Sequence, residues 1–360
     1  MNNKETEVIS VLNNKGGVLK TTSLLNIAFI LAKLGNKVLV VDADGQANST
    51  ASFDIFNEKY KGKFEDGQFH TDFIKNTTID ILKIDKDNRD TSKIMKTIED
   101  SIFKDVFVSA DHEIENIKKQ INLEQGRINF YKKAKNSSEK IDSIIKEHES
   151  NILKLSDKIK EISLNTRGSI DLIAANSDLR LFEREMLKEM RVTGKYQGNS
   201  KLQNVLSFLK MSYDFILIDA PPSLGMISEN IMAAATKLIV PMEMETYSIQ
   251  GVSNIINTYY DLKEDYPTIK LAAILPTKIN TRLKIHQDSY KSLAKYLKEH
   301  EPEFFKSLLP FEDGVRLSGK SATELGRSNK TLSEQEWFKK NDKKHQNVNS
   351  YIKLVKEYIL

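Results

Sequence analysis

The feature of this sequence that most constrains its fold is the loop at residues 13–22, which reads Asn-Asn-Lys-Gly-Gly-Val-Leu-Lys-Thr-Thr. An apolar run, Val8–Leu12, precedes the loop, and an amphipathic run, Thr21–Leu34, follows it. A strand, a glycine-bearing loop and a helix start form a phosphate cradle, because loop N–H groups and the helix N-terminus point at the anion and Lys20 adds a positive charge. The order of these segments therefore predicts a nucleotide-binding loop.

Two features distinguish this loop from an ordinary phosphate loop. A second lysine, Lys15, stands at its start, and Leu19 occupies the position before Lys20 where glycine is expected. Leucine is tolerated there if its backbone is helical, so we predict a negative φ for Leu19. Lys20 is suited to the β and γ phosphates and the Thr21 hydroxyl to Mg²⁺. The predicted nucleotide-binding residues of the loop are Lys15, Gly16, Gly17, Val18, Leu19, Lys20, Thr21 and Thr22.

The composition of the 360 residues narrows the possible chemistry. The absence of cysteine excludes disulfides, thiolate zinc sites and iron–sulfur ligation. No apolar stretch approaches the ~20 residues that a spanning helix needs, so we expect a cytoplasmic protein. A net charge of +4 permits a weak interaction with DNA or an anionic membrane without demanding one.

Apolar runs alternate with helix-like segments along most of the chain. This alternation predicts a doubly wound α/β domain with a mainly parallel sheet, the architecture of a P-loop NTPase, as a single domain over residues 1–360. The predicted strands are Val8–Leu12, Val38–Val41, Ile170–Ala174, Phe215–Ile218, Leu238–Val240 and Leu271–Leu275. The predicted helices include Thr21–Leu34, Ser228–Ala235, Ser248–Leu262 and Gln287–His300.

One block, residues 110–164, interrupts the alternation. It contains no proline, is rich in Lys and Glu, and carries isoleucines at heptad-like spacing on both sides of a turn signal at 135–138. We expect an inserted α-helical hairpin, in which His148 is a tolerated polar residue of the seam. The sequence leaves two roles open: a spacer arm without a ligand, or an arm that docks a partner or modulates a dimer.

Two further carboxylates follow predicted strands. Asp44 comes just after Val38–Val41, and Asp219 ends the strand Phe215–Ile218 in the manner of a Walker B aspartate. The carboxyl ends of strands in open α/β sheets are where ligands bind. We therefore expect Thr21, Asp44 and Asp219 to form the Mg²⁺ site, with Asp44 also orienting or deprotonating the attacking water.

Four segments carry a family resemblance: Lys15–Thr22, Asp42–Asn48, Asp219–Ser223 and the stretch 315–318. Together they resemble the ParA/Soj family of partition ATPases, within the ParA/MinD class that has a deviant Walker A loop. The resemblance covers roughly residues 8–53 and 169–324 and leaves out the hairpin.

The resemblance implies an ATPase that binds ATP or ADP with Mg²⁺ and turns over slowly until a partner stimulates it. It implies a nucleotide sandwich homodimer in which Lys15 reaches the phosphates of the other subunit, with Lys15, Asp44 and Lys20 as catalytic residues. It also implies nonspecific binding of double-stranded DNA by the ATP dimer, a ParB-like centromere-binding partner, and association with the nucleoid.

Basic residues late in the chain are the expected DNA surface. Arg282 and Arg316 match family positions, and Lys278, Lys284 and Lys320 are neighbours in sequence. Phosphate contacts require charge rather than base-edge geometry. A further resemblance places Pro310 against the adenine, although two extra residues separate it from Val315.

Two alternative functions remain open. The tail, residues 346–360, has apolar residues at helical spacing with lysines between them, which suits either a terminal helix packed on the core or the interfacial helix of a MinD-like positioning ATPase. We expect the packed helix and no membrane partner. The second alternative is a weakly hydrolysing, nucleotide-gated scaffold. In this scaffold Leu19, and Gly45 where the family usually has proline after Asp44, have reduced turnover, and the hairpin binds a partner.

Overall fold

The computed structural model describes most of the chain. The described residues are 5–53, 64–65, 68–69, 77–82, 91–108, 111–133, 139–165, 168–179, 200–223, 225–244, 266–316 and 346–360, with scattered single residues between 184 and 264. The predicted helix Ser248–Leu262, the turn at 135–138 and Lys320 lie outside them wholly or in large part.

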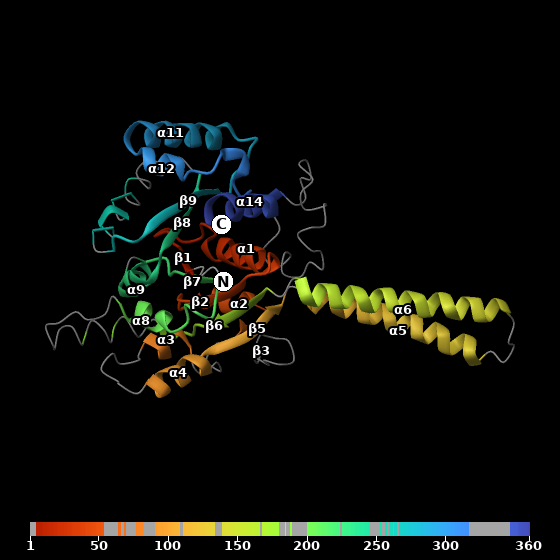
Figure 1. The fold of residues 1–360 in the computed structure, drawn as a ribbon. Helices are drawn as coiled ribbons and strands as arrows, with labels where there is room; N and C mark the ends of the chain where they lie inside the picture. The colour runs from red at the N-terminus through yellow and green to blue at the C-terminus, as the bar shows by residue number, and fades with distance from the viewer. Residues whose placement is uncertain are drawn as a thin grey trace.

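A seven-stranded sheet forms the centre of the molecule (Figure 1). Its order is β5-β6-β2-β7-β1-β8-β9, and every neighbouring pair is parallel except β5 and β6. Its strands are β1 (Glu7–Val11), β2 (Lys37–Asp42), β5 (Ile102–Val108), β6 (Ser169–Ile173), β7 (Phe215–Asp219), β8 (Lys237–Glu243) and β9 (Lys270–Thr277). A separate pair comprises β3 (Phe64–Glu65) and β4 (Gln68–Phe69). The doubly wound, mainly parallel sheet is confirmed.

Helices cover both faces of this sheet (Figure 1). The described α-helices, on the sheet and beyond it, are α1 (Lys20–Lys33), α2 (Asn48–Ser52), α3 (Thr78–Leu82), α4 (Thr91–Asp100), α5 (Asp111–Lys133), α6 (Glu139–Asn165), α8 (Lys201–Ser207), α9 (Met226–Ala234), α11 (Lys284–His300), α12 (Pro302–Lys306) and α14 (Gln346–Leu354). A 3₁₀ turn, η3 (Phe311–Asp313), and a π-helical turn, η4 (Val355–Ile359), complete the described elements.

The central strands are apolar on both faces because each face is covered. Along β7, Phe215 and Leu217 belong to the core beneath α1 and α14, whereas Ile216 and Ile218 belong to the core beneath α8, α9 and α11. Successive side chains of a strand point to opposite faces, so a continuous apolar run can fill two cores. All six predicted strands are present for this reason.

The edge strand β5 was not predicted. Its sequence places the polar pair Lys104 and Asp105 in the middle of an apolar stretch, and the register shifts between Phe103 and Phe107. An irregular antiparallel edge strand lacks the continuous apolar run that identifies a central strand.

Helices α5 and α6 pack side by side and extend away from the sheet (Figure 1). Ile117 and Ile128 are buried between them, and His148 lies in the seam, where Nδ1 is 2.5 Å from a carboxylate oxygen of Glu124 and the ring stacks on Tyr131. The predicted hairpin helices and the polar seam position of His148 are therefore observed. Among the described helices, none combines the length and apolar character needed to cross a bilayer.

Candidate nucleotide-binding site

The phosphate loop joins β1 to α1 as the sequence predicts, but its backbone differs from the prediction at one residue. Leu19 has φ +68° and ψ 32°, in the left-handed region, so the prediction of a negative φ was wrong. Its carbonyl accepts the first helical bond, from the Ser23 N–H at 2.9 Å, and its side chain packs on the core beneath α1. This packing and the turn into the helix hold leucine in a conformation that costs roughly 1–2 kcal/mol.

Glycine occupies the other left-handed position of the loop. Gly17 has φ +73°, a conformation that glycine adopts without strain. The chain therefore turns twice in the left-handed sense within three residues before α1 begins at Lys20. This turning directs the loop towards the N-terminus of the helix, where an anion is best stabilised.

Lys20 is the first residue of α1, and its side chain lies against the phosphate loop that precedes it. Its side chain is largely buried, and Nζ donates to the Lys15 carbonyl at 3.2 Å. Burial lowers the pKa of Lys20, whereas the nearby carboxylates of Asp219 and Asp44 act in the opposite direction. A desolvated ammonium group beside helix N–H groups is a strong binding point for phosphate oxygens.

Asp219, at the end of β7, is the centre of a small polar cluster. Its Oδ2 accepts hydrogen bonds from the Thr21 hydroxyl and from the Ser49 hydroxyl, both at 2.7 Å, and the residue is fully buried. Its Oδ1 is also buried and has no hydrogen-bond partner. Mg²⁺ prefers oxygen ligands and is usually held by one or two carboxylates together with phosphates, so an orphaned carboxylate oxygen beside a threonine hydroxyl fits that ion. The structure thus brings together Thr21 and Asp219, two of the predicted metal residues.

Asp42 and Asp44 have different surroundings. Asp42 is buried and accepts three hydrogen bonds: from the Thr50 N–H and hydroxyl, each at 2.7 Å, and from the Asp44 N–H at 3.1 Å. It therefore closes the turn that carries residues 43–50. Asp44 is bound by the Gln46 N–H at 2.9 Å and is close enough to Asp219 and Lys20 to influence the pKa of each.

Lys15 points out of the loop, and its side chain is 55% exposed. Its backbone N–H donates to Asn13 Oδ1 at 2.8 Å, and its Nζ lies 2.8 Å from a carboxylate oxygen of Glu243. Lys278 approaches the other oxygen of the same carboxylate, at 3.2 Å. Of the predicted DNA residues, Lys278 thus lies beside the phosphate loop.

Two residues of this site were missed by the sequence analysis. Ser49 is the second residue of α2, directly after the turn that carries Asp44, and Glu243 ends β8, the strand that pairs with β1. Glu243 could have been predicted, because a polar residue at the carboxyl end of a strand beside the loop lies where ligands bind. Ser49 had no comparable signal in the sequence, since serine is common in and beside turns.

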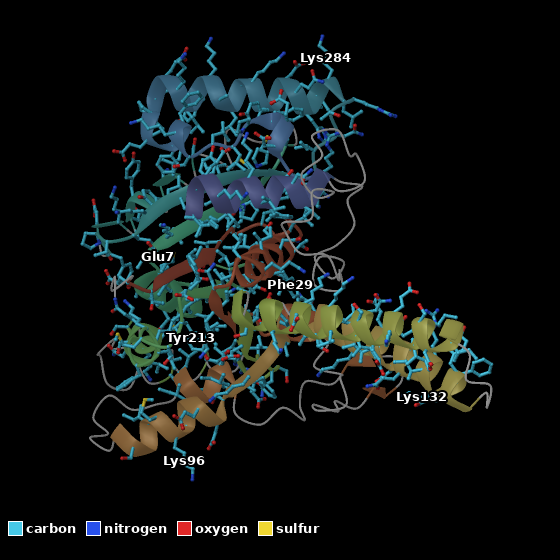
Figure 2. All side chains as sticks on the ribbon, turned by 45° about the vertical axis from the view of Figure 1, so that its right-hand side comes forward. Glu7, Phe29, Lys96, Lys132, Tyr213 and Lys284 are labelled. Atoms are coloured by element: carbon cyan, nitrogen blue, oxygen red, sulfur yellow. The ribbon has the colours of Figure 1, made fainter. Side chains whose placement is uncertain are left out.

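The remaining basic residues gather near the start of α11. Residues 279 and 316 form an isolated parallel bridge, and Arg316 Nη1 donates to the Thr281 hydroxyl at 3.2 Å. Arg282 and Lys284 are exposed, and Lys284 lies at the opposite end of the molecule from Lys96 of α4 (Figure 2). The structure thus brings together the chain segments of Arg282, Lys284 and Arg316, while Lys320 is outside the described residues.

Pro310 lies in a segment that runs beside β9. The Leu309 N–H donates to the Ile274 carbonyl at 3.0 Å, and the Val315 N–H donates to the Pro276 carbonyl at 2.8 Å. These bonds bring Pro310 to the edge strand that leads to Lys278. Its predicted contact with the adenine stays a prediction.

The C-terminal helix packs on α1. Tyr351 is fully buried, with its hydroxyl 3.1 Å from that of Ser23, and Val355 and Ile359 are buried with it. The apolar side of the tail therefore faces the core, as expected for a packed terminal helix. The interfacial membrane helix of the MinD-like alternative would need that side to be exposed.

The chain is similar to known proteins over most of its length. The family model of the AAA domain matches residues 6–147 and 131–271. A ParA family protein of Mycoplasma pneumoniae is 25% identical over 322 residues, covering 89% of this chain and 86% of that protein. The sporulation initiation inhibitor protein Soj of Bacillus subtilis is 23% identical over 313 residues, covering 87% of this chain and 86% of that protein.

A solved structure agrees with the fold. The putative plasmid partition protein of Borrelia burgdorferi B31, bound to AMPPNP, superposes with a TM-score of 0.55 at 18% identity, covering 99% of this chain and 100% of that chain. The family match extends over more than half of the chain and includes the phosphate loop and Asp219. The chain therefore belongs to the AAA-domain P-loop ATPases and, within them, to the ParA/Soj family of the ParA/MinD class.

Proposed function

We propose that this protein is a ParA-type partition ATPase that dimerises when it binds ATP. The dimer binds DNA without sequence preference and segregates plasmid or chromosomal DNA together with a ParB-like partner. The observation that carries the proposal is the phosphate loop itself. Lys20 lies inside the loop and Lys15 points out of it, and this difference supports separate roles in which each lysine binds a different phosphate.

Each residue of the site has a separate role in this proposal. Lys20 and the N–H groups of residues 16–22 bind the phosphates of the subunit's own nucleotide. The Thr21 hydroxyl and the Asp219 carboxylate hold Mg²⁺, which supplies charge neutralisation when it is bound. Asp44 orients the attacking water, and Lys15 reaches the nucleotide of the partner subunit. Pro310 lines the adenine.

The Thr21–Asp219–Ser49 cluster gives a physical basis for switching. In this structure the Asp219 carboxylate is shared between the phosphate-loop helix, through Thr21, and the turn after β2, through Ser49. Engagement of Asp219 by Mg²⁺ and nucleotide would alter both hydrogen bonds at once. The turn that carries Asp44 would then respond to the nucleotide, as regulated hydrolysis requires.

DNA binding in this proposal comes from Arg282, Lys284 and Arg316, with Lys320 as a further candidate. Arg282 and Lys284 are exposed beside one another, and Arg316 is tied to the same loop through Thr281. Charges of this kind bind the phosphate backbone and do not read bases. The protein would accordingly associate with the nucleoid in the cytoplasm.

A DNA-binding assay with different nucleotides tests the proposal. The protein is titrated against a random-sequence duplex with ATP and Mg²⁺, with ADP and Mg²⁺, and without nucleotide. We expect binding with ATP that weakens steeply with salt and is indifferent to sequence. Equal binding with ADP, or no binding with ATP at low salt, would overturn it.

The nucleotide-gated scaffold is tested by turnover. If the protein is a partition ATPase, it should hydrolyse ATP slowly alone and faster with a partner. This hydrolysis should be lost in Asp44→Ala and should survive deletion of residues 110–164. Absence of any turnover in the wild-type protein, with nucleotide binding intact, would favour the scaffold instead.

A further inference from the structure

One carboxylate holds two lysines at the mouth of the phosphate loop. Glu243 Oε2 lies 2.8 Å from Lys15 Nζ, and Glu243 Oε1 lies 3.2 Å from Lys278 Nζ. The glutamate side chain is only 10% exposed, whereas the lysine side chains are 55% and 27% exposed. A nearly buried carboxylate is thus paired with one exposed cation and one more enclosed cation.

The surrounding structure fixes this carboxylate relative to the loop. Glu243 ends β8, which pairs with β1, and Asn13 at the loop start donates its side-chain N–H to the Pro241 carbonyl at 2.7 Å. Lys15 is therefore held from two sides, through its backbone by Asn13 and through its side chain by Glu243.

Lys278 reaches this cluster through an unusual backbone. It is one of three non-glycine residues with a positive φ in the described chain, at +51°, and the other two, Leu19 and Ala47, belong to the phosphate loop and the turn after β2. A Cβ built on Gly17 would lie 4.0 Å from Lys278 Nζ, so the ammonium group sits against the loop. Strained residues that persist in a fold are often held for a functional reason.

We propose that Glu243 is an intrachain counterion that holds Lys15 back from the dimer contact, and that Lys278 keeps Glu243 paired when Lys15 leaves. The inference rests on the proposed function, since the destination of Lys15 is the nucleotide of a partner subunit. Before dimerisation Lys15 is bound within its own chain. Dimerisation is then an exchange of counterions, from the Glu243 carboxylate to the partner's phosphates.

The physical reason for two lysines is the burial of the carboxylate. A charged group with little access to water is strongly destabilising when its partner is removed. With Lys15 as the single cation, its departure would leave Glu243 in that state. Lys278 removes this penalty, so Lys15 can exchange partners at the low free energy typical of an exposed ion pair.

The proposal also gives Lys278 a role other than the DNA contact expected from the sequence. Its ammonium group is paired with Glu243 and has that carboxylate to itself once Lys15 departs, so it contributes little to a DNA surface. It is a positioning residue of the nucleotide site, which acts through Glu243.

Three variants of the full chain test the proposal by sedimentation velocity, which measures the dimer dissociation constant at saturating ATP and Mg²⁺. Glu243→Gln releases Lys15, so we expect the dissociation constant to fall about three- to tenfold, the size expected for one partly exposed ion pair in each of two protomers. In Lys278→Met, Lys15 is the remaining lysine paired with Glu243, and its departure would leave the carboxylate unpaired. Dimerisation should therefore weaken several-fold. The double variant should resemble Glu243→Gln, because Lys278 acts only through the carboxylate.

Glu7→Gln is the matched control. It removes a glutamate that pairs with Lys237 at 3.3 Å, at the other end of β8, and should leave dimerisation unchanged. A dissociation constant for Glu243→Gln that is unchanged or higher would overturn the proposal, as would tighter dimers in Lys278→Met. The second variant alone decides the matter if thermal melting shows that Glu243→Gln does not fold. A wild-type protein that stays monomeric with ATP would instead contradict the proposed function.

Discussion

Asp42 and Asp219 are register partners at the ends of the adjacent strands β2 and β7, and both are fully buried. Two carboxyl groups so placed favour binding a proton. Burial raises the pKa of Asp42 to about 7, with a further contribution from the charge of Asp219, and burial likewise raises the pKa of Asp219.

This pair makes the stability of the nucleotide-free protein depend on pH. The pKa values of both carboxyl groups are higher in the folded state than the unfolded value of about 3.9, so the folded state binds protons more tightly. The stabilisation that comes from this proton binding is complete below about pH 4 and is lost as pH rises through about 7. We expect Asp219→Asn to gain stability relative to wild type as pH rises over this window, by up to about 1.4 kcal/mol per pH unit. Urea denaturation at several pH values in EDTA measures the difference. A constant difference between pH 4 and 8 would contradict the prediction.

The left-handed backbone of Leu19 predicts a strong dependence on side-chain shape. A β-branched residue is worse than leucine at a positive φ, so Leu19→Ile should destabilise the fold by about 1–2 kcal/mol at unchanged volume. Leu19→Gly relieves the strain but loses packing and adds chain entropy, so its net change should stay within about 1 kcal/mol. Chemical denaturation of both variants checks the order, and equal stability of Leu19→Ile and wild type would refute the argument.

The outward direction of Lys15 and the inward direction of Lys20 predict separable effects. Lys15→Gln should spare nucleotide binding by the monomer and abolish ATP-dependent dimers, because its target is the other subunit. Lys20→Gln should lose nucleotide binding itself. Fluorescent ADP titration and sedimentation velocity distinguish the two. Unchanged ATP-dependent dimers in Lys15→Gln would remove its assigned role.

Exposed charges near α11 predict a change in the salt dependence of DNA binding. Arg282→Gln and Lys284→Gln should each lower the slope of log K against log[salt] by about 0.9, if each residue neutralises one phosphate. Lys295→Gln is the control on the same helix, since this exposed lysine lies 4.0 Å from Glu299 and farther along the helix. A slope that none of the three variants alters would place the DNA surface elsewhere.

The packing of the tail predicts a stability effect without a membrane effect. Tyr351→Phe removes a buried hydrogen bond to Ser23 and should cost about 1 kcal/mol, whereas Tyr351→Ala should cost about 3–5 kcal/mol. Neither variant should change co-sedimentation with anionic liposomes, and the wild-type protein should not co-sediment. Binding of wild type that is lost on removing residues 346–360 would revive the MinD-like alternative.

Much of the fold could be predicted because its signals are local. The apolar runs of β2 and β7 identify buried parallel strands, and the heptad-like spacing around His148 identifies the two helices of the hairpin. The edge strand β5 was not predictable in this way, since Lys104 and Asp105 interrupt its apolar stretch. The backbone of Leu19 was mispredicted because the decisive interaction, its packing on the core beneath α1, involves residues distant in sequence.

By itself, the sequence determined the phosphate loop, the strands that flank it and the carboxylates at their ends, because these depend on residue type at short spacing. Only the tertiary structure decided which distant groups meet. The Ser49–Asp219 contact spans 170 positions, and the Lys15–Glu243 contact spans 228. Both depend on strand order, since β7 lies between β2 and β1, and β8 lies on the other side of β1. Strand order is set by the burial of both faces of the sheet and by the crossover connections between strands. Local spacing in the sequence does not encode either of these.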